Sequence, residues 1–229
     1  MAKKDEKTPL EFLETAEGLK TELETDLNKV QHVVESNKNV FAGVGGILLA
    51  IVLGYFGYKY YITTQDAEGQ AKLFGPVYQF EADSNKIAAK ELGKVADDFG
   101  GNTGNLANFY AGVANLKEGK FDLAIEQLKS FSSSDLLVQA RAYALIGDAY
   151  AEKKAYSDAI DYYKKAAEYK ANKFFTPTYL MKLAAAYEAN NEPKEALAIY
   201  SQIVEKYAES SESINAKKYK AVLEGSVSE

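Results

Sequence analysis

The chain has no cysteine and no tryptophan, and it contains only one histidine and one arginine. Without thiols it has no disulfide, no cysteine nucleophile and no cysteine-ligated metal site. A lone histidine such as His32 is typical of a surface residue rather than of a metal ligand. With Arg141 as the only arginine and a formal net charge of −6, the 229-residue chain is poorly suited to binding nucleic-acid phosphates.

Catalytic motifs are also missing. No GxSxG or Walker motif occurs, and the GGNTG segment at 100–104 lacks the following Lys-Ser/Thr of a phosphate loop, so we expect it to be a connector. The acids Asp97 and Asp98, and Glu209 with Glu212, lie in polar settings at helix ends, which is typical of solvated carboxylates. The sequence therefore predicts no catalytic residue, no cofactor site and no metal ligand, and a protein that is not an enzyme.

What the chain does have is one long uncharged run at 40–58, VFAGVGGILLAIVLGYFGY. As a helix it would be about 28 Å long, close to the hydrocarbon thickness of a bilayer. The run is too long for the apolar core of a cleaved signal peptide, and no AxA site follows it. We therefore predict an uncleaved transmembrane signal anchor over 40–62 rather than a buried core helix. Lysines bracket the run and aromatic residues crowd its C-terminal end, as at a membrane interface: Lys38, Lys59, Tyr55, Phe56, Tyr58, Tyr60 and Tyr61.

Small residues recur at every fourth position of this run. At that spacing they line one face of a helix and let a second helix approach closely. The sequence therefore predicts a transmembrane packing face made of Ala42, Gly46, Ala50 and Gly54.

Residues 1–39 precede the run as an arm. Thr8-Pro9-Leu10-Glu11 is typical of a capping box, and apolar residues from Phe12 to Val34 recur at spacings of three or four, which predicts an amphipathic helix. We expect it to dock on a partner or form a short coiled coil, with a partly ordered polar tail as the alternative. Three lysines before the run against two after it within about 20 residues slightly favour an N-terminus on the cytoplasmic side.

The remainder of the chain, 63–229, has an internal period. Ala124, Ala159 and Ala196 are each followed four residues later by a large residue, and their spacings are 35 and 37. The clearest preceding motif is Y-x₂-I-G-x₂-Y at 143–150. This resembles the tetratricopeptide repeat, in which a small residue lets two paired helices approach and large residues fill the layer between repeats. We predict repeats at 105–138, 140–173 and 177–210, with Gly112 and Gly147 where paired helices touch.

A degenerate unit is predicted before these repeats, at 66–100, because Ala88 stands 36 residues before Ala124. Its helices are expected at 70–81 and 86–99, with a kink or break at Pro76. Thr176-Pro177 should open a helix as N-cap and first helical residue. A capping helix at 211–224 should cover the last repeat. The predicted fold class is all-α: an amphipathic helix and one transmembrane helix, followed by a tetratricopeptide-repeat solenoid.

A repeat array without catalytic groups offers its surface to partners. The first helices of such repeats line a groove that binds an extended peptide or a partner helix. The helical wheel predicts the following partner-groove residues: Phe109, Tyr110, Val113, Leu116, Arg141, Leu145, Asp148, Met181, Lys182 and Glu188. The alternative is that some of the apolar residues, Leu116 and Leu145 above all, belong to the core.

The whole layout resembles a narrower family. Asn37-Lys38 precedes the apolar run, GYFGYKYY closes it at 54–61, and degenerate repeats complete the chain. This is similar to the YfgM-like family, an ancillary subunit of the bacterial SecYEG translocon. The resemblance implies a bacterial inner-membrane protein with a cytoplasmic N-terminus and a periplasmic repeat domain. Its implied partners are translocon subunits, periplasmic chaperones and client polypeptides.

Two other functions fit the same sequence features. One is a receptor for targeting peptides on an organelle surface, with the repeats in the cytosol. The other is a structural scaffold in a secretion or division complex of the cell envelope. The side of the membrane on which the repeats lie distinguishes the first, and the identity of co-purifying proteins distinguishes the second.

Overall fold

The computed structural model describes residues 35–227 and, before them, residues 18, 20, 21, 23–25, 27, 28, 31 and 32. The described residues up to Ser36 are helical, Asn37 forms a turn, and no strand occurs in the described part of the chain. The capping box expected at 8–11 lies outside the described residues. The all-α prediction is confirmed for the rest, whose helices are α2 (Lys38–Glu81), α3 (Asn85–Asp98), α4 (Gly101–Lys117), α5 (Phe121–Ser130), α6 (Leu136–Glu152), α7 (Tyr156–Glu168), α8 (Thr176–Ala189), α9 (Pro193–Lys206) and α10 (Glu212–Val227).

The chain divides into two units, Met1–Tyr61 and Ile62–Glu229. In the first unit, the apolar run lies within α2, and its large side chains are exposed, Ile47 by 64% and Leu53 by 63%. Within the described residues, α2 is the one helix long and apolar enough to cross a membrane. A Cβ atom added at Gly46 or Gly54 would meet nothing within 4 Å, so the predicted packing face is open.

Pro76 does not interrupt α2, which runs unbroken to Glu81, so the predicted break is wrong, as is a separate helix beginning at residue 70. The proline is buried and stands twelve residues before Ala88, the offset that separates Gly147 from Ala159. It therefore occupies the small-residue position of its helix pair. Leu73 and its neighbours Val77 and Phe80 pack in a core shared with α3 and α4, and this packing offsets the missing backbone hydrogen bond.

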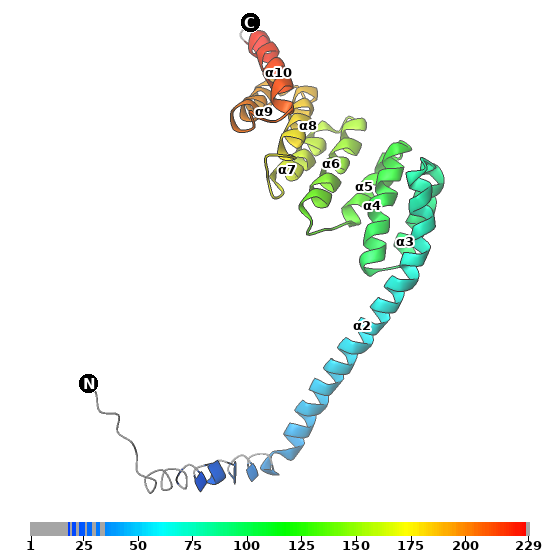
Figure 1. Cartoon of the computed structure of the whole chain (residues 1–229), viewed down its shortest axis with the longest axis vertical. Coiled ribbons are helices and arrows are strands. Elements are labelled where there is room, and N and C mark those ends of the chain that lie inside the picture. The colour runs from blue at the N-terminus through cyan, green and yellow to red at the C-terminus, as the bar shows by residue number, and fades with distance from the viewer. Residues whose placement is uncertain are drawn as a thin grey trace, which may run out of the picture. The chain divides into compact units, whose positions relative to one another are not determined.

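The second unit is a stack of helix pairs, α4 with α5, α6 with α7, and α8 with α9, preceded by the end of α2 with α3 and closed by α10 (Figure 1). From α3 to α10 each helix packs on the next one along the chain, and Leu73 near the end of α2 packs against α3 and α4. The apolar core follows the stack as three clusters, which join α2 to α4, α4 to α7, and α7 to α10.

The same tight turn joins the two helices of every pair. One residue has a left-handed backbone, with φ of 57° at Asp83, 72° at Gly119, 59° at Lys154 and 66° at Asn191. The next residue donates its N–H to a carbonyl five residues back over 2.9 Å in all four turns, as Lys120 does to Asn115. This is the Schellman helix ending. Its fourfold recurrence shows that α2 and α3 are joined by the same turn as the later pairs.

Paired helices touch at the predicted glycines. A Cβ at Gly147 would lie 2.7 Å from Cδ1 of Tyr163, and one at Gly112 would lie 2.6 Å from Cγ of Leu128. The third pair has Ala184 at this position, fully buried. At each crossing a small residue faces a large one, as the repeat pattern requires.

The GGNTG segment is not a connector, contrary to the sequence prediction. Only Phe99 and Gly100 connect α3 to α4, and α4 begins at Gly101. Asp66 of α2 supplies the acceptors for this helix start, because Thr103 donates its N–H to Asp66 Oδ1 (3.3 Å) and its hydroxyl to the Asp66 carbonyl (3.2 Å). A Cβ at Gly104 would lie 1.9 Å from the Phe99 carbonyl oxygen, so the glycine allows this close approach.

Thr176 is not the N-cap of α8 either. It is the first residue of the helix and is buried, and its hydroxyl bonds the N–H of Asn172 (2.8 Å) and the Ala167 carbonyl (3.5 Å). The Asn172 side chain instead accepts the N–H groups of Phe174 and Phe175, both at 3.0 Å. The side chain that accepts N–H groups at this helix start thus belongs to Asn172, four residues before Thr176, whose own hydroxyl is used in the core.

Substitution of Gly147 by alanine tests the helix contact. Because the new Cβ would press on the Tyr163 ring, we expect Gly147→Ala to lower the free energy of unfolding by about 1–3 kcal/mol. The matched control is Gly93→Ala in α3, where a Cβ would lie 3.4 Å from the flexible Gln127 amide. There the better helix propensity should leave stability unchanged or raise it by up to ~1 kcal/mol. Thermal melts of the full chain in detergent, followed by tyrosine near-ultraviolet circular dichroism, measure both; equal melting of the two variants would contradict the contact.

Candidate functional site

A pocket of about 550 Å³ opens between the first helices of the repeats, and we call it the groove pocket. Its walls come from the ends of α4 and α6, from the turn that leads into α5, and from single residues of α7 and α8. Charged side chains of both signs and apolar side chains line it. The lining residues are Leu116, Lys117, Gly119, Phe121, Asp148, Ala151, Glu152, Tyr163 and Lys182.

Asp148 of α6 is the centre of the polar contacts in this pocket. Its Oδ1 atom accepts a hydrogen bond from the Tyr163 hydroxyl at 2.7 Å and another from Lys182 Nζ at 2.7 Å. The ion pair is partly screened, since the side chains of Lys182 and Asp148 are 41% and 27% exposed. A pair of this kind contributes about 0.2–1 kcal/mol. The ion pair joins α6 to α8, and the Tyr163 hydrogen bond joins α7 to the same carboxylate.

Burial raises the pKa of the Tyr163 phenol, and the nearby Asp148 carboxylate raises it further, because a negative charge disfavours a phenolate. The next repeat contains a similar arrangement, in which Tyr200 donates to Glu188 at 2.5 Å. There too burial, and then the carboxylate, raises the pKa of Tyr200. In both repeats, therefore, the large residue of the second helix also orients an acid of the first.

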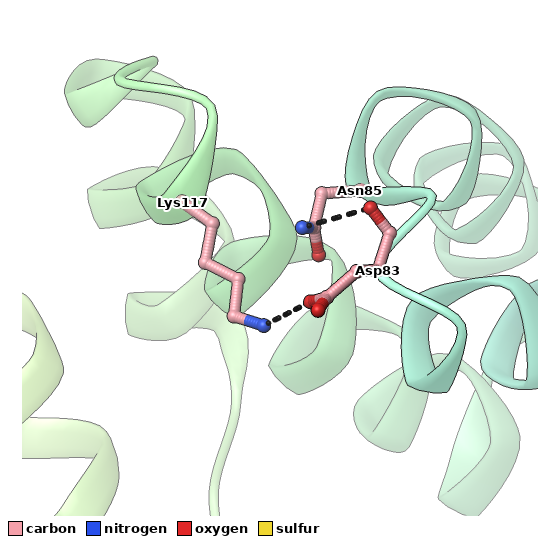
Figure 2. A network of polar contacts seen from close by, with 3 residues as sticks. All are labelled: Asp83, Asn85 and Lys117. Atoms are coloured by element: carbon pink, nitrogen blue, oxygen red, sulfur yellow. Dashed lines mark hydrogen bonds and ion pairs between the residues drawn. The ribbon is translucent and has the colours of Figure 1, made fainter.

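Lys117, at the end of α4, is drawn toward the preceding turn (Figure 2). Its Nζ lies 3.0 Å from Asp83 Oδ1 and 5.0 Å from the centre of the Phe80 ring. The side-chain amide of Asn85 donates to the Asp83 carbonyl at 3.3 Å and helps hold this turn. The hydrogen bond and charge of Lys117 lower the pKa of Asp83, whose side chain is otherwise well exposed.

The structure distributes the apolar residues of the predicted groove unequally. Val113 is buried at 7% exposure, and Phe109, Leu116 and Leu145 are half-buried against the same core cluster. Tyr110 stacks edge-on against Phe80 at 5.5 Å between ring centres. Met181 packs on the core cluster of the last repeat. These side chains are therefore buried or half-buried rather than fully exposed.

The polar residues of the predicted groove lie closer to solvent. Arg141 and Glu188 are exposed, and Asp148 and Lys182 meet in the pocket although the sequence placed them 34 residues apart. Sequence reasoning missed Lys117, Glu152 and Tyr163 as members of the site. Lys117 and Glu152 each follow a predicted groove residue by four positions, so the helical period itself would have found them.

The chemistry of the groove pocket is that of its charged side chains. Among the described residues, no group of three or more His, Cys, Asp or Glu side chains is placed to hold a metal ion. Asp148 has its charge neutralised by Lys182. The pocket presents two lysines and two acids beside a few apolar side chains.

The raised pKa of Tyr163 predicts a pH dependence of stability. In the unfolded chain tyrosine ionises near pH 10, whereas the folded state keeps this proton. The contribution of the Tyr163 phenol to the free energy of unfolding is therefore fully present below about pH 10 and is lost as the pH rises above this value. Tyr163→Phe should cost about 1 kcal/mol at neutral pH, for the lost hydrogen bond, and should make the fall of Tm between about pH 9 and 11 shallower. Melts of the full chain across this range, with exposed Tyr78→Phe as the control, test this; parallel curves for all three proteins would contradict it.

Comparison with known proteins agrees with this architecture. Two family models, both described as tetratricopeptide repeat, match residues 111–173 and 179–210. No curated protein matches the chain. Among solved structures, residues 41 to the end of MamA from Desulfovibrio magneticus RS-1 superpose with a TM-score of 0.52 at 18% identity, over 62% of this chain and 77% of that one. At that identity the likeness concerns the fold alone. The chain is thus a tetratricopeptide repeat-containing protein.

Proposed function

We propose that the protein is a non-enzymatic, membrane-anchored binding subunit that holds a segment of a protein partner in its groove pocket. The observation that carries this proposal is the pocket itself, an open site between repeat helices that combines charged side chains of both signs with apolar ones. Tetratricopeptide repeats bind protein partners through surfaces of this kind. The apolar part of α2 would be the anchor, since it has the length and composition of a membrane span.

The proposed setting is the bacterial inner membrane, with the N-terminus in the cytoplasm and the repeats in the periplasm. Two features support it: the lysine distribution around the span, and the resemblance of the layout to the YfgM-like ancillary subunit of the SecYEG translocon. In that setting the anchor would lie beside the translocon through its small-residue face. The repeats would receive emerging clients and pass them to periplasmic chaperones.

The chain's composition is compatible with this setting and equally with a reducing one. It has no cysteine, so it needs no disulfide chemistry and exposes no thiol in either compartment. A scaffold in a cell-envelope assembly would share this property. The two functions differ in the protein that occupies the groove.

A photo-crosslinking experiment tests the proposed function. The full chain, in membranes of the cells that produce it, carries a photoreactive amino acid at Ala151 in the pocket or, as the control, at exposed Asp161 on α7. We expect covalent adducts from position 151 and few from position 161, because only the first lies where the partner is held. Mass spectrometry identifies the adducts.

The identity of the adducts separates the alternatives. Translocon subunits, chaperones or secretory clients would support the translocon role. Components of another envelope complex would favour the scaffold function. Equal adducts from both positions, or none from position 151, would overturn the binding role of the groove.

A further inference from the structure

The two lysines of the groove pocket already have partners. Lys182 pairs with Asp148 at 2.7 Å, and Lys117 pairs with Asp83 at 3.0 Å while lying over the Phe80 ring. An anionic ligand would have to compete with a carboxylate for either cation. The positive charges of the pocket are therefore used within the protein.

The two carboxylates of the groove pocket, Asp148 and Glu152, are not fully paired with cations of the protein. Both hydrogen bonds to Asp148 end on Oδ1, which leaves Oδ2 without a partner among the described residues. Glu152 follows Asp148 by one turn of α6, lines the same pocket, is exposed, and has no hydrogen bond or ion pair within the described part of the chain. Both acids act on the buried Tyr163 phenol of the same pocket. Burial first, and then each of the two negative charges, raises the pKa of Tyr163.

Apolar side chains stand beside these two acids. Leu116 and Phe121 are half-buried, and Ala151 lies between Asp148 and Glu152 on α6. A long side chain with a hydrocarbon stem and a charged end would match this combination, because the stem covers apolar surface while the head meets the carboxylates. Lysine and arginine are the side chains of that kind.

We propose that the groove pocket receives a lysine or arginine side chain of the partner polypeptide, with its stem along Leu116, Phe121 and Ala151 and its cationic head between Glu152 and Asp148 Oδ2. This inference rests on the proposed function and names the chemistry that the groove selects. Glu152 is the specificity residue, since Asp148 is already committed to Lys182 and Tyr163. Basic segments of a partner would thus be favoured over acidic ones.

Peptide selection tests the inference without knowledge of the natural partner. Random twelve-residue peptides displayed on phage are selected on the full chain in nanodiscs, and the selected peptides are then synthesised and their Kd values measured. We expect a recurring lysine or arginine whose replacement by norleucine weakens binding about threefold to tenfold. Glu152→Gln should weaken the same peptides by a similar factor, and added salt should reduce this difference.

The control variant is Glu126→Gln, which removes the same charge from the exposed face of α5, outside the pocket. Its peptide affinities should equal those of the unaltered chain. A charge reversal gives a second arm: Glu152→Lys should reject the basic peptides and regain affinity for versions that carry glutamate in place of the basic residue.

The outcomes separate this inference from the proposed function. Peptides that bind with equal affinity to Glu152→Gln, but lose affinity when Ala151→Leu narrows the pocket, would overturn the cationic preference and leave the binding groove in place. Peptides that are indifferent to Ala151→Leu, or a selection that yields none, would overturn both. Affinity lost with Glu152→Gln and kept with Glu126→Gln would support both.

Discussion

The close approach of the two helices within each repeat is the contact on which the rest of the structure depends. At Gly112 and Gly147 the approach leaves no room for a Cβ atom, and at Ala184 the methyl group is fully buried. A large residue of the second helix, Leu128 or Tyr163, fills the space. Interiors packed at this density do not tolerate an added group without displacement. This contact sets the distance between the two helices of a pair, and the recurring left-handed turn sets the direction in which the second helix leaves the first.

Because the pairs are built alike, the ends of their first helices come together at regular intervals. Side chains far apart in sequence then meet, as Asp148 meets Lys182 and Lys117 meets Asp83. These ion pairs are partly exposed and contribute little to the free energy of folding. Their consequence is for binding: they use the two lysines of the groove pocket and leave Glu152 available. The charge that the site offers to a ligand is that of Glu152, which the protein's own ion pairs do not neutralise.

The repeat period and the sizes of the repeated residues predicted the helix pairs, because each of Ala124, Ala159 and Ala196 lies where two neighbouring helices cross. The failures arose where a distant residue decided the local structure. The glycines at 100–104 are typical of a loop, but Asp66, more than thirty residues earlier, provides the acceptor that starts a helix there. Pro76 is typical of a break, but packing around Leu73 keeps α2 continuous. For the site, the helical period identified Asp148 and Lys182 as surface residues, whereas their pairing with each other depended on the stack.

Hydrogen exchange of the full chain in nanodiscs, with and without the partner recovered from the native membrane, tests whether the first helices of the repeats form the functional surface. We expect slower amide exchange in α4, α6 and α8 when the partner is bound, with α5, α7 and α9 unchanged, because the groove pocket is built chiefly by α4, α6 and α8. Protection confined to α5, α7 and α9, or to α10, would contradict it, as would a partner that protects no helix of the repeat unit.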